Sequence, residues 1–190
     1  MARGINRAAR TFNASAQATH STKAFTGSTS KPCVFISYHH EDESACQKIA
    51  DYLINAEIDV YFDKYDKTLS QLVNEGNADK VTKRIQDGID FSSHMLCVVS
   101  ITTVKSYWVP FEVGYGYPKI ALGIMTLKGV EESSLPEYMK TTKVIRGTKS
   151  LNDFISGLLS QSVDSLSIKG LIRKASEQQH PLDEVLDWNK

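Results

Sequence analysis

The chain has 190 residues, of which 41% are hydrophobic, and it carries 22 basic and 22 acidic side chains. A chain of this length can bury one core, so we expect a single domain with further segments at its ends. The balanced charge disfavours a nucleic-acid binder, which normally has a basic surface. No run approaches the roughly 20 apolar residues of a membrane-spanning helix. We therefore expect a soluble protein with neither nucleic acid nor a membrane as partner.

The three cysteines, Cys33, Cys46 and Cys97, are far apart in the sequence and form no CxxC or Cys/His cluster. This pattern is typical of small core residues in a reducing compartment. We therefore expect a cytoplasmic protein with no bound metal.

Residues 1–30 contain Arg3, Arg7, Arg10 and Lys23 but no acidic residue, and they are rich in Ala, Ser and Thr. Such a segment has little to bury, so we predict a disordered basic arm. Its composition also resembles an organelle transit peptide, but we favour a nonspecific basic tail.

Two short apolar runs predict the first two strands. Residues 33–36 are apolar and stop abruptly at the polar residues 37–40, as a buried strand does where it enters a loop. Residues 58–63 alternate between apolar and polar side chains, which predicts a strand with one apolar face. That face comprises Ile58, Val60 and Phe62.

Helical periodicity predicts two helices in the first half of the domain. The acidic residues 41–43 suit a first helical turn, and the apolar residues of the first helix recur every four positions. Residues 64–77 show no sustained period, and a polar connection of this length is usually functional or mobile, so we expect a candidate lid there. The apolar residues are Ala45, Ile49 and Leu53 on the first helix, and Ala78, Val81, Ile85 and Ile89 on the second.

The second half of the domain continues the alternation of strands and helices. Residues 95–99 are almost continuously apolar, which predicts the central strand of a parallel sheet. Further strands are predicted at 120–127 and 144–145, with a weak helical pattern at 135–140 between them. Residues 150–153 fit a capping pattern before a last helix.

Strand followed by helix, five times over, predicts an α/β domain. We expect a flavodoxin-like, five-stranded parallel sheet in the order 2-1-3-4-5, flanked by helices, over residues 31–162. Residues 163–190 carry apolar side chains at helical spacing, with a break at His180-Pro181. They predict a C-terminal helical extension that packs on this domain or on another subunit.

Ligands bind a sheet of this order at the carboxyl ends of strands 1 and 3. The predicted ends are residues 37–39 and 100–102, and the segment with Glu112 follows the second of them. Trp108 lies four residues earlier, so a helix would carry both side chains on one face. A carboxylate beside a flat ring suits a ribose linked to an aromatic base; the alternative is a core tryptophan and a solvated glutamate. Because proline suits only a helix's first turn, Pro110 places the helix start near Trp108, at the lip of the crevice.

Residues 33 to about 160 resemble a Toll/interleukin-1 receptor (TIR) domain. No single piece of the resemblance is specific, but six pieces in the family's order are. The pieces are residues 34–38, residues 60–63, Gly76, residues 85–89 with Ser92 and Ser93, residues 98–100, and Ser106-x-Trp108-x-x-x-Glu112. Pro110, inside the last piece, departs from the family pattern.

The resemblance implies one of two roles. TIR domains are either scaffolds that assemble with other proteins or enzymes that cleave the nicotinamide glycosidic bond of NAD+. Glu112 occupies the place of the catalytic glutamate. In bacterial members an arrangement like Trp108 to Glu112 goes with cyclic or rearranged ADP-ribose signals, as in Thoeris anti-phage defence. By this resemblance NAD+ is a substrate, no further cofactor is needed, and copies associate through TIR–TIR contacts. A separate effector protein would sense the product.

We expect Glu112 to stabilise the developing sugar cation as an ionised carboxylate, helped by a position in the first turn of its helix. Trp108 would stack on the adenine and direct cyclisation. A non-catalytic TIR scaffold and an enzyme similar to nucleoside deoxyribosyltransferases are the alternatives. We predict that the substrate-binding residues are Ser37, Tyr38, His39, Phe62, Asp63 and Trp108, although Tyr38 and Phe62 also suit a core and His39 a loop.

Overall fold

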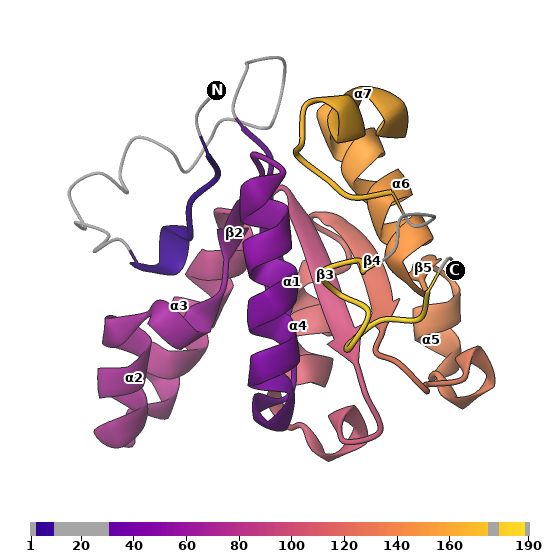
Figure 1. Cartoon of the computed structure of the whole chain (residues 1–190). Helices are drawn as coiled ribbons and strands as arrows, with labels where there is room; N and C mark the ends of the chain where they lie inside the picture. Colours follow the sequence, from indigo (N-terminus) through magenta and orange to yellow (C-terminus); the bar gives the residue numbers. More distant parts are fainter. Residues whose placement is uncertain (1–2, 10–30, 175–178, 189–190) are drawn as a thin grey trace.

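The computed structural model describes residues 3–9, 31–174 and 179–188. Figure 1 shows a sheet with helices packed on its two faces. The strands are β1 (Cys33–Ser37), β2 (Asp59–Tyr61), β3 (His94–Val99), β4 (Ala121–Thr126) and β5 (Lys143–Ile145). All neighbouring pairs are parallel, in the order β2-β1-β3-β4-β5. The predicted flavodoxin-like sheet, with β3 at its centre, is confirmed.

Helices connect successive strands, as a parallel sheet requires. The connecting helices are α1 (Glu43–Asn55), α2 (Lys67–Asn74), α3 (Ala78–Asp90), α4 (Trp108–Gly116) and α5 (Glu137–Lys140). Two further helices, α6 (Thr148–Leu159) and α7 (Val163–Ile168), follow β5. α1 and α6 pack on one face of the sheet, and α3 and α4 pack on the other (Figure 1).

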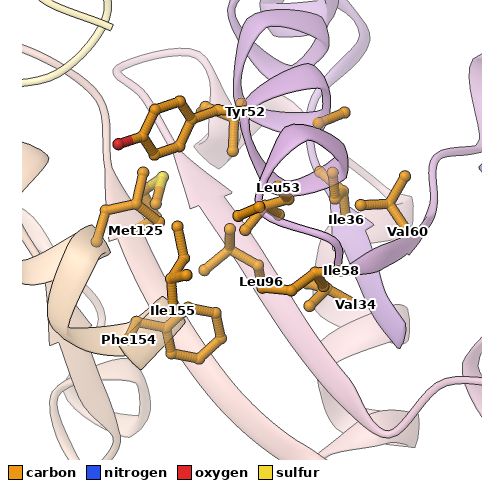
Figure 2. Close-up of a cluster of buried hydrophobic side chains, with 14 of the residues drawn as sticks. Val34, Ile36, Tyr52, Leu53, Ile58, Val60, Leu96, Met125, Phe154 and Ile155 are labelled. Atoms are coloured by element: carbon orange, nitrogen blue, oxygen red, sulfur yellow. The ribbon is translucent and has the colours of Figure 1, made fainter. Parts of the chain in front are cut away.

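The core on the α1 side brings residues from distant parts of the chain together. Figure 2 shows Leu53 of α1, Leu96 of β3 and Ile155 of α6 in this core. All three are buried, and burial of one such side chain contributes about 1.5–3 kcal/mol. Ala45 is only half-buried, so the buried stripe of α1 lies slightly off the predicted one. The predicted apolar face of the second strand, Ile58, Val60 and Phe62, lies in this core.

The core on the opposite face is built mainly by β3, α3 and α4. Ile85 and Ile89 of α3 and Val113 of α4 are buried there. A Cβ atom at Gly88 would lie 2.7 Å from the ring of Tyr61. Glycine at this position therefore allows α3 to pack closely against β2.

Residues 64–77, the candidate lid, show no sustained period in the sequence, but the structure has a helix within them. Lys67–Asn74 form α2, and Asp66 caps its start by accepting a hydrogen bond from Leu69 N at 3.0 Å. The same carboxylate is buried and accepts hydrogen bonds of 2.6 Å from both Tyr61 Oη and Arg84 Nε. These partners hold the start of α2 against β2 and α3.

The start of the last predicted helix of the domain also differs from expectation. α6 begins at Thr148, so the predicted capping residues 150–153 lie inside the helix. Ser150 Oγ still accepts hydrogen bonds from the backbone N–H groups of Arg146 (2.9 Å) and Gly147 (3.1 Å). The serine therefore caps the helix from within its first turn.

Both ends of the chain contact the domain. Residues 3–9, which we assigned to a disordered arm, contain a short 3-10 helix (Arg7–Ala9) and bond to β2. Residues 10–30 and the predicted helical residue Ala175 lie outside the described residues. At the other end α7 stops at Ile168, and Ile172, Leu182 and Leu186 pack into the α1-side core without a helix. Within the ranges given above, every helix is too short or too polar to cross a bilayer.

Candidate functional site

Glu112 lies where the topology placed it, above the carboxyl ends of β1 and β3. Only 6% of its surface is exposed, so it is not a solvated surface charge. Ser37 Oγ donates a hydrogen bond of 2.6 Å to Glu112 Oε2. Ser37 is the last residue of β1 and is paired with Cys97 of β3. The acid is therefore anchored at the end of the sheet where we predicted that a ligand binds.

The electrostatic environment of Glu112 is the opposite of the expected one. Burial is the main cause that raises the pKa of Glu112 from 4.5 to about 8, and the negative charge of Asp63 adds to the rise. The hydrogen bond from Ser37 opposes it, because a donor favours the ionised form. Glu112 is the fifth residue of α4, which has no acidic residue in its first turn. The helix N-terminus therefore does not keep this carboxyl ionised as predicted.

Asp63 follows β2 and belongs to the same acidic region. Burial raises its pKa to about 6, nearby Asp66 adds to the rise, and a hydrogen bond from Tyr38 lowers it. Asp63 Oδ1 is buried and has no hydrogen-bond partner among the residues that the structure describes. A buried acceptor without a partner is costly, and it is suited to a donor that a ligand brings.

Tyr38 and Phe62 pack against each other beside this region. Their ring centroids are 5.1 Å apart. Phe62 is fully buried in the α1-side core, and Tyr38 packs against that core. The core role that the sequence left open for these residues is therefore present, and Tyr38 also contacts the site through its bond to Asp63.

His39 is buried in the loop after β1. Its Nδ1 accepts a hydrogen bond of 3.4 Å from Glu41 N, which caps the short 3-10 helix His40–Asp42. His39, His40 and Glu41 have potential ligand atoms within 4.8 Å of one another. Because His39 Nδ1 is already engaged in capping and the other two side chains are exposed, we assign this group to loop structure.

Trp108 is the first residue of α4 and is 41% exposed. Its ring meets the ring of Phe111 edge-on, with centroids 5.9 Å apart. Pro110 is the third residue of the helix, so it lies in the first turn as predicted. Trp108 is not a core residue, and its partly exposed ring can receive another flat ring.

Hydrogen bonds between the loop after β1 and the loop after β3 were not predicted from the sequence. Asp42 Oδ2 accepts hydrogen bonds from Ser100 Oγ (2.6 Å) and Thr102 Oγ1 (3.3 Å). Asp42 precedes α1, whereas Ser100 and Thr102 follow β3. The acid was assigned to the first turn of a helix, and only its position in space shows that it ties the loop after β1 to the loop after β3.

Two cavities lie away from Glu112. One of about 410 Å³ lies at the amino ends of β3 and β4, beside His94 and Ala121. The other, of about 550 Å³, lies between α1 and the C-terminal residues, beside Tyr52 and Arg173. Because only 6% of the surface of Glu112 is exposed, we call the candidate site closed in this structure.

Comparison with protein-family models matches residues 34–146 to the TIR domain. No curated protein matches the chain. The matched residues contain all of the candidate site residues from Ser37 to Glu112.

Proposed function

Because the chain belongs to the TIR domain family, we propose that it cleaves the nicotinamide glycosidic bond of NAD+ and makes a cyclic or rearranged ADP-ribose signal for anti-phage immunity. One observation carries this proposal. A buried carboxyl, Glu112, is anchored by Ser37 at the ends of β1 and β3, where sheets of this order bind ligands.

The reaction needs only one carboxylate. The bond from ribose C1′ to the pyridinium nitrogen breaks, and its electron pair leaves with the nitrogen, so nicotinamide departs neutral and requires no general acid. The positive charge that develops on the sugar is stabilised by Glu112. An adenine ring nitrogen then forms the new bond to C1′ with its lone pair, or a ribose hydroxyl forms it and loses its proton. Capture by water, which also loses a proton, gives ADP-ribose instead.

The raised pKa of Glu112 fits a cationic substrate. In the closed site the carboxyl holds a proton at neutral pH, since its pKa is about 8. A pyridinium nearby lowers that pKa, because an opposite charge favours the ionised form. Binding of NAD+ would thus ionise Glu112 as the cation arrives. Asp63 Oδ1, without a partner among the described residues, would accept a hydrogen bond from a substrate hydroxyl or amide.

A substrate can reach Glu112 only if the loops around it move. The Asp42–Ser100 hydrogen bond joins the two loops above it, so their separation is the simplest opening. We propose that assembly with other copies drives this opening and that residues 64–77 of a neighbour complete the pocket. Trp108, partly exposed at the start of α4, would then stack on the adenine.

The setting that we propose is the cytoplasm, where a separate effector protein senses the product. The three cysteines are buried and unpaired, which suits a reducing compartment.

The deciding experiment incubates the full chain with NAD+ and follows nicotinamide release over a range of protein concentrations. We expect release that rises more than linearly with concentration. Glu112→Gln should lower the rate on the order of a hundredfold or more, because it removes the charge that stabilises the sugar cation. A rate that Glu112→Gln leaves unchanged would remove Glu112 from the mechanism.

One observation favours a second function, a non-catalytic TIR scaffold. The low exposure of Glu112 is also what a purely structural acid would show. A scaffold would associate and release no nicotinamide at any concentration, and Glu112→Gln would leave its association unchanged.

A further inference from the structure

Residues 3–9, here called the first segment, lie along the outer edge of β2, the edge strand of the sheet (Figure 1). Val60 N donates to Ile5 O at 2.9 Å, and Ile5 N donates to Asp59 Oδ1 at 3.1 Å. Asn6 forms a parallel bridge with Val60. The first segment thus covers the edge strand as an additional short strand would.

Arg7 anchors the first segment. Its guanidinium donates to Asp59 Oδ2 (Nε, 3.0 Å) and to the carbonyl oxygens of Phe91 (3.2 Å) and Lys31 (3.1 Å). Asp59 and the neighbouring Ala8 are buried. A guanidinium has five N–H donors in a fixed geometry, so one side chain ties the segment to three separate parts of the domain.

Asn6 contacts the polypeptide just beyond the end of β2. Its Nδ2 donates to Phe62 O at 3.1 Å, and its Oδ1 accepts from Phe62 N at 3.2 Å. Oδ1 also accepts from Ala8 N at 3.0 Å, which orients the carboxamide. The side chain therefore bonds both backbone polar groups of Phe62, as a neighbouring strand would, and the next residue is Asp63.

We propose that Asn6 is a positioning residue for the candidate site: by holding the backbone of Phe62 it fixes the position of the next residue, Asp63, whose carboxyl oxygen Oδ1 is buried without a partner among the described residues. The proposal rests on the proposed function for its catalytic consequence, but the geometry stands without it. Asp63 Oδ1 is buried, and the charge of Asp63 contributes to the raised pKa of Glu112. The effect of Asp63 on the pKa of Glu112 falls as the distance between the two carboxyl groups grows. If the backbone of Phe62 were no longer held, Asp63 could move away and its effect would weaken.

The test is the titration of the Glu112 carboxyl, followed by NMR in the full chain labelled at glutamate. Asn6→Ala should lower the titration midpoint of Glu112, in the same direction as Asp63→Asn, which removes the neighbouring charge. Arg3→Ala, at an exposed side chain of the same segment, should leave the midpoint where it is. Thermal unfolding and the amide spectrum of β3 would confirm that each variant keeps the fold.

Two results would overturn the proposal. If Asp63→Asn lowers the midpoint and folded Asn6→Ala does not, Asn6 only supports the fold. If neither variant moves the midpoint, Asp63 does not act on Glu112. Should Asn6→Ala fail to fold, Arg7→Lys provides the second variant, because it keeps a cation at Asp59 but loses the bonds that orient the first segment; the same shift is expected.

Enzyme kinetics separate this proposal from the proposed function. If the chain releases nicotinamide, Asn6→Ala should lower kcat/KM about threefold to tenfold at pH values above the rising limb, because a displaced Asp63 loses its proposed contact with the substrate. The same variant should move the pH midpoint of kcat/KM in the direction seen for Asp63→Asn. If the chain has no such activity, the proposed function fails, while the NMR titration still decides whether Asn6 positions Asp63.

Discussion

Ser37 Oγ donates a hydrogen bond of 2.6 Å to the carboxyl of Glu112, 75 residues further along the chain. Two opposing influences meet in this pair. Burial and the charge of Asp63 favour the protonated carboxyl, whereas the Ser37 donor favours the ionised one. The balance between them determines the pH at which Glu112 becomes a carboxylate.

Ser37→Ala should raise the pKa of Glu112 above about 8, because it removes the hydrogen bond that lowers it. The profile of kcat/KM against pH reports the pKa of groups in the free enzyme, so its rising limb should move to higher pH and the rate at pH 7 should fall. Asp63→Asn should move the limb to lower pH. If both variants shift the limb in the same direction, this account of the electrostatics is wrong.

Glu112→Gln should stabilise the folded protein at alkaline pH. The folded-state pKa is raised from 4.5 to about 8, so the folded state binds the proton more tightly than the unfolded chain does. Stability therefore falls as pH rises between these values. The glutamine variant lacks this loss. At pH 8.5 its free energy of unfolding should exceed that of the wild-type protein by an amount on the order of 2–4 kcal/mol.

Urea unfolding at pH 6.5 and pH 8.5 measures this effect. The pKa of Asp63 is about 6, so most of its own contribution to the slope lies at lower pH. The wild-type protein should lose free energy of unfolding between the two values, and the glutamine variant should lose less. Equal slopes would show that Glu112 is ionised in the folded state at both pH values.

Asp66→Ala should destabilise the protein by about 3–5 kcal/mol, since it removes the buried carboxylate that pairs with the partly buried guanidinium of Arg84. It also removes the cap of α2 and the partner of Tyr61 Oη. Urea unfolding measures the loss, and amide exchange should rise first along α2. Lys67→Ala, one residue further and exposed, is the matched control with little expected change. A small loss for Asp66→Ala would show that α2 is held mainly by its apolar contacts.

Trp108→Ala should change the product more than the stability. The side chain is 41% exposed, so its removal leaves the core intact. Without a ring to hold the adenine near C1′, water captures the sugar cation more often, and the product should shift from cyclised species towards ADP-ribose. Chromatography of the products measures the ratio, and Tyr107→Ala, at an aromatic side chain that is 94% exposed, is the control. An unchanged ratio in Trp108→Ala discards the stacking role.

The amino-acid sequence by itself determined the strand order, the central place of β3 and the position of Glu112 relative to the strand ends. The strand order is the usual one for five alternating strands and helices, and the elements themselves follow from local patterns. A strand buried on both faces needs an almost continuous apolar run, as in residues 95–99. The core residues of a helix recur at a fixed period, as Ile85 and Ile89 do. Pro110 likewise located the start of α4, because its ring excludes it from a helix interior.

Only the tertiary structure decided the protonation of Glu112 and the role of the first segment. The pKa of Glu112 depends on burial under other elements and on Asp63, 49 residues earlier in the sequence. Asn6 reaches Phe62 across 56 residues, and no periodic signal marks such a contact. Local sequence encodes which residues turn towards a core; the charges and donors that meet there are set by how distant segments pack.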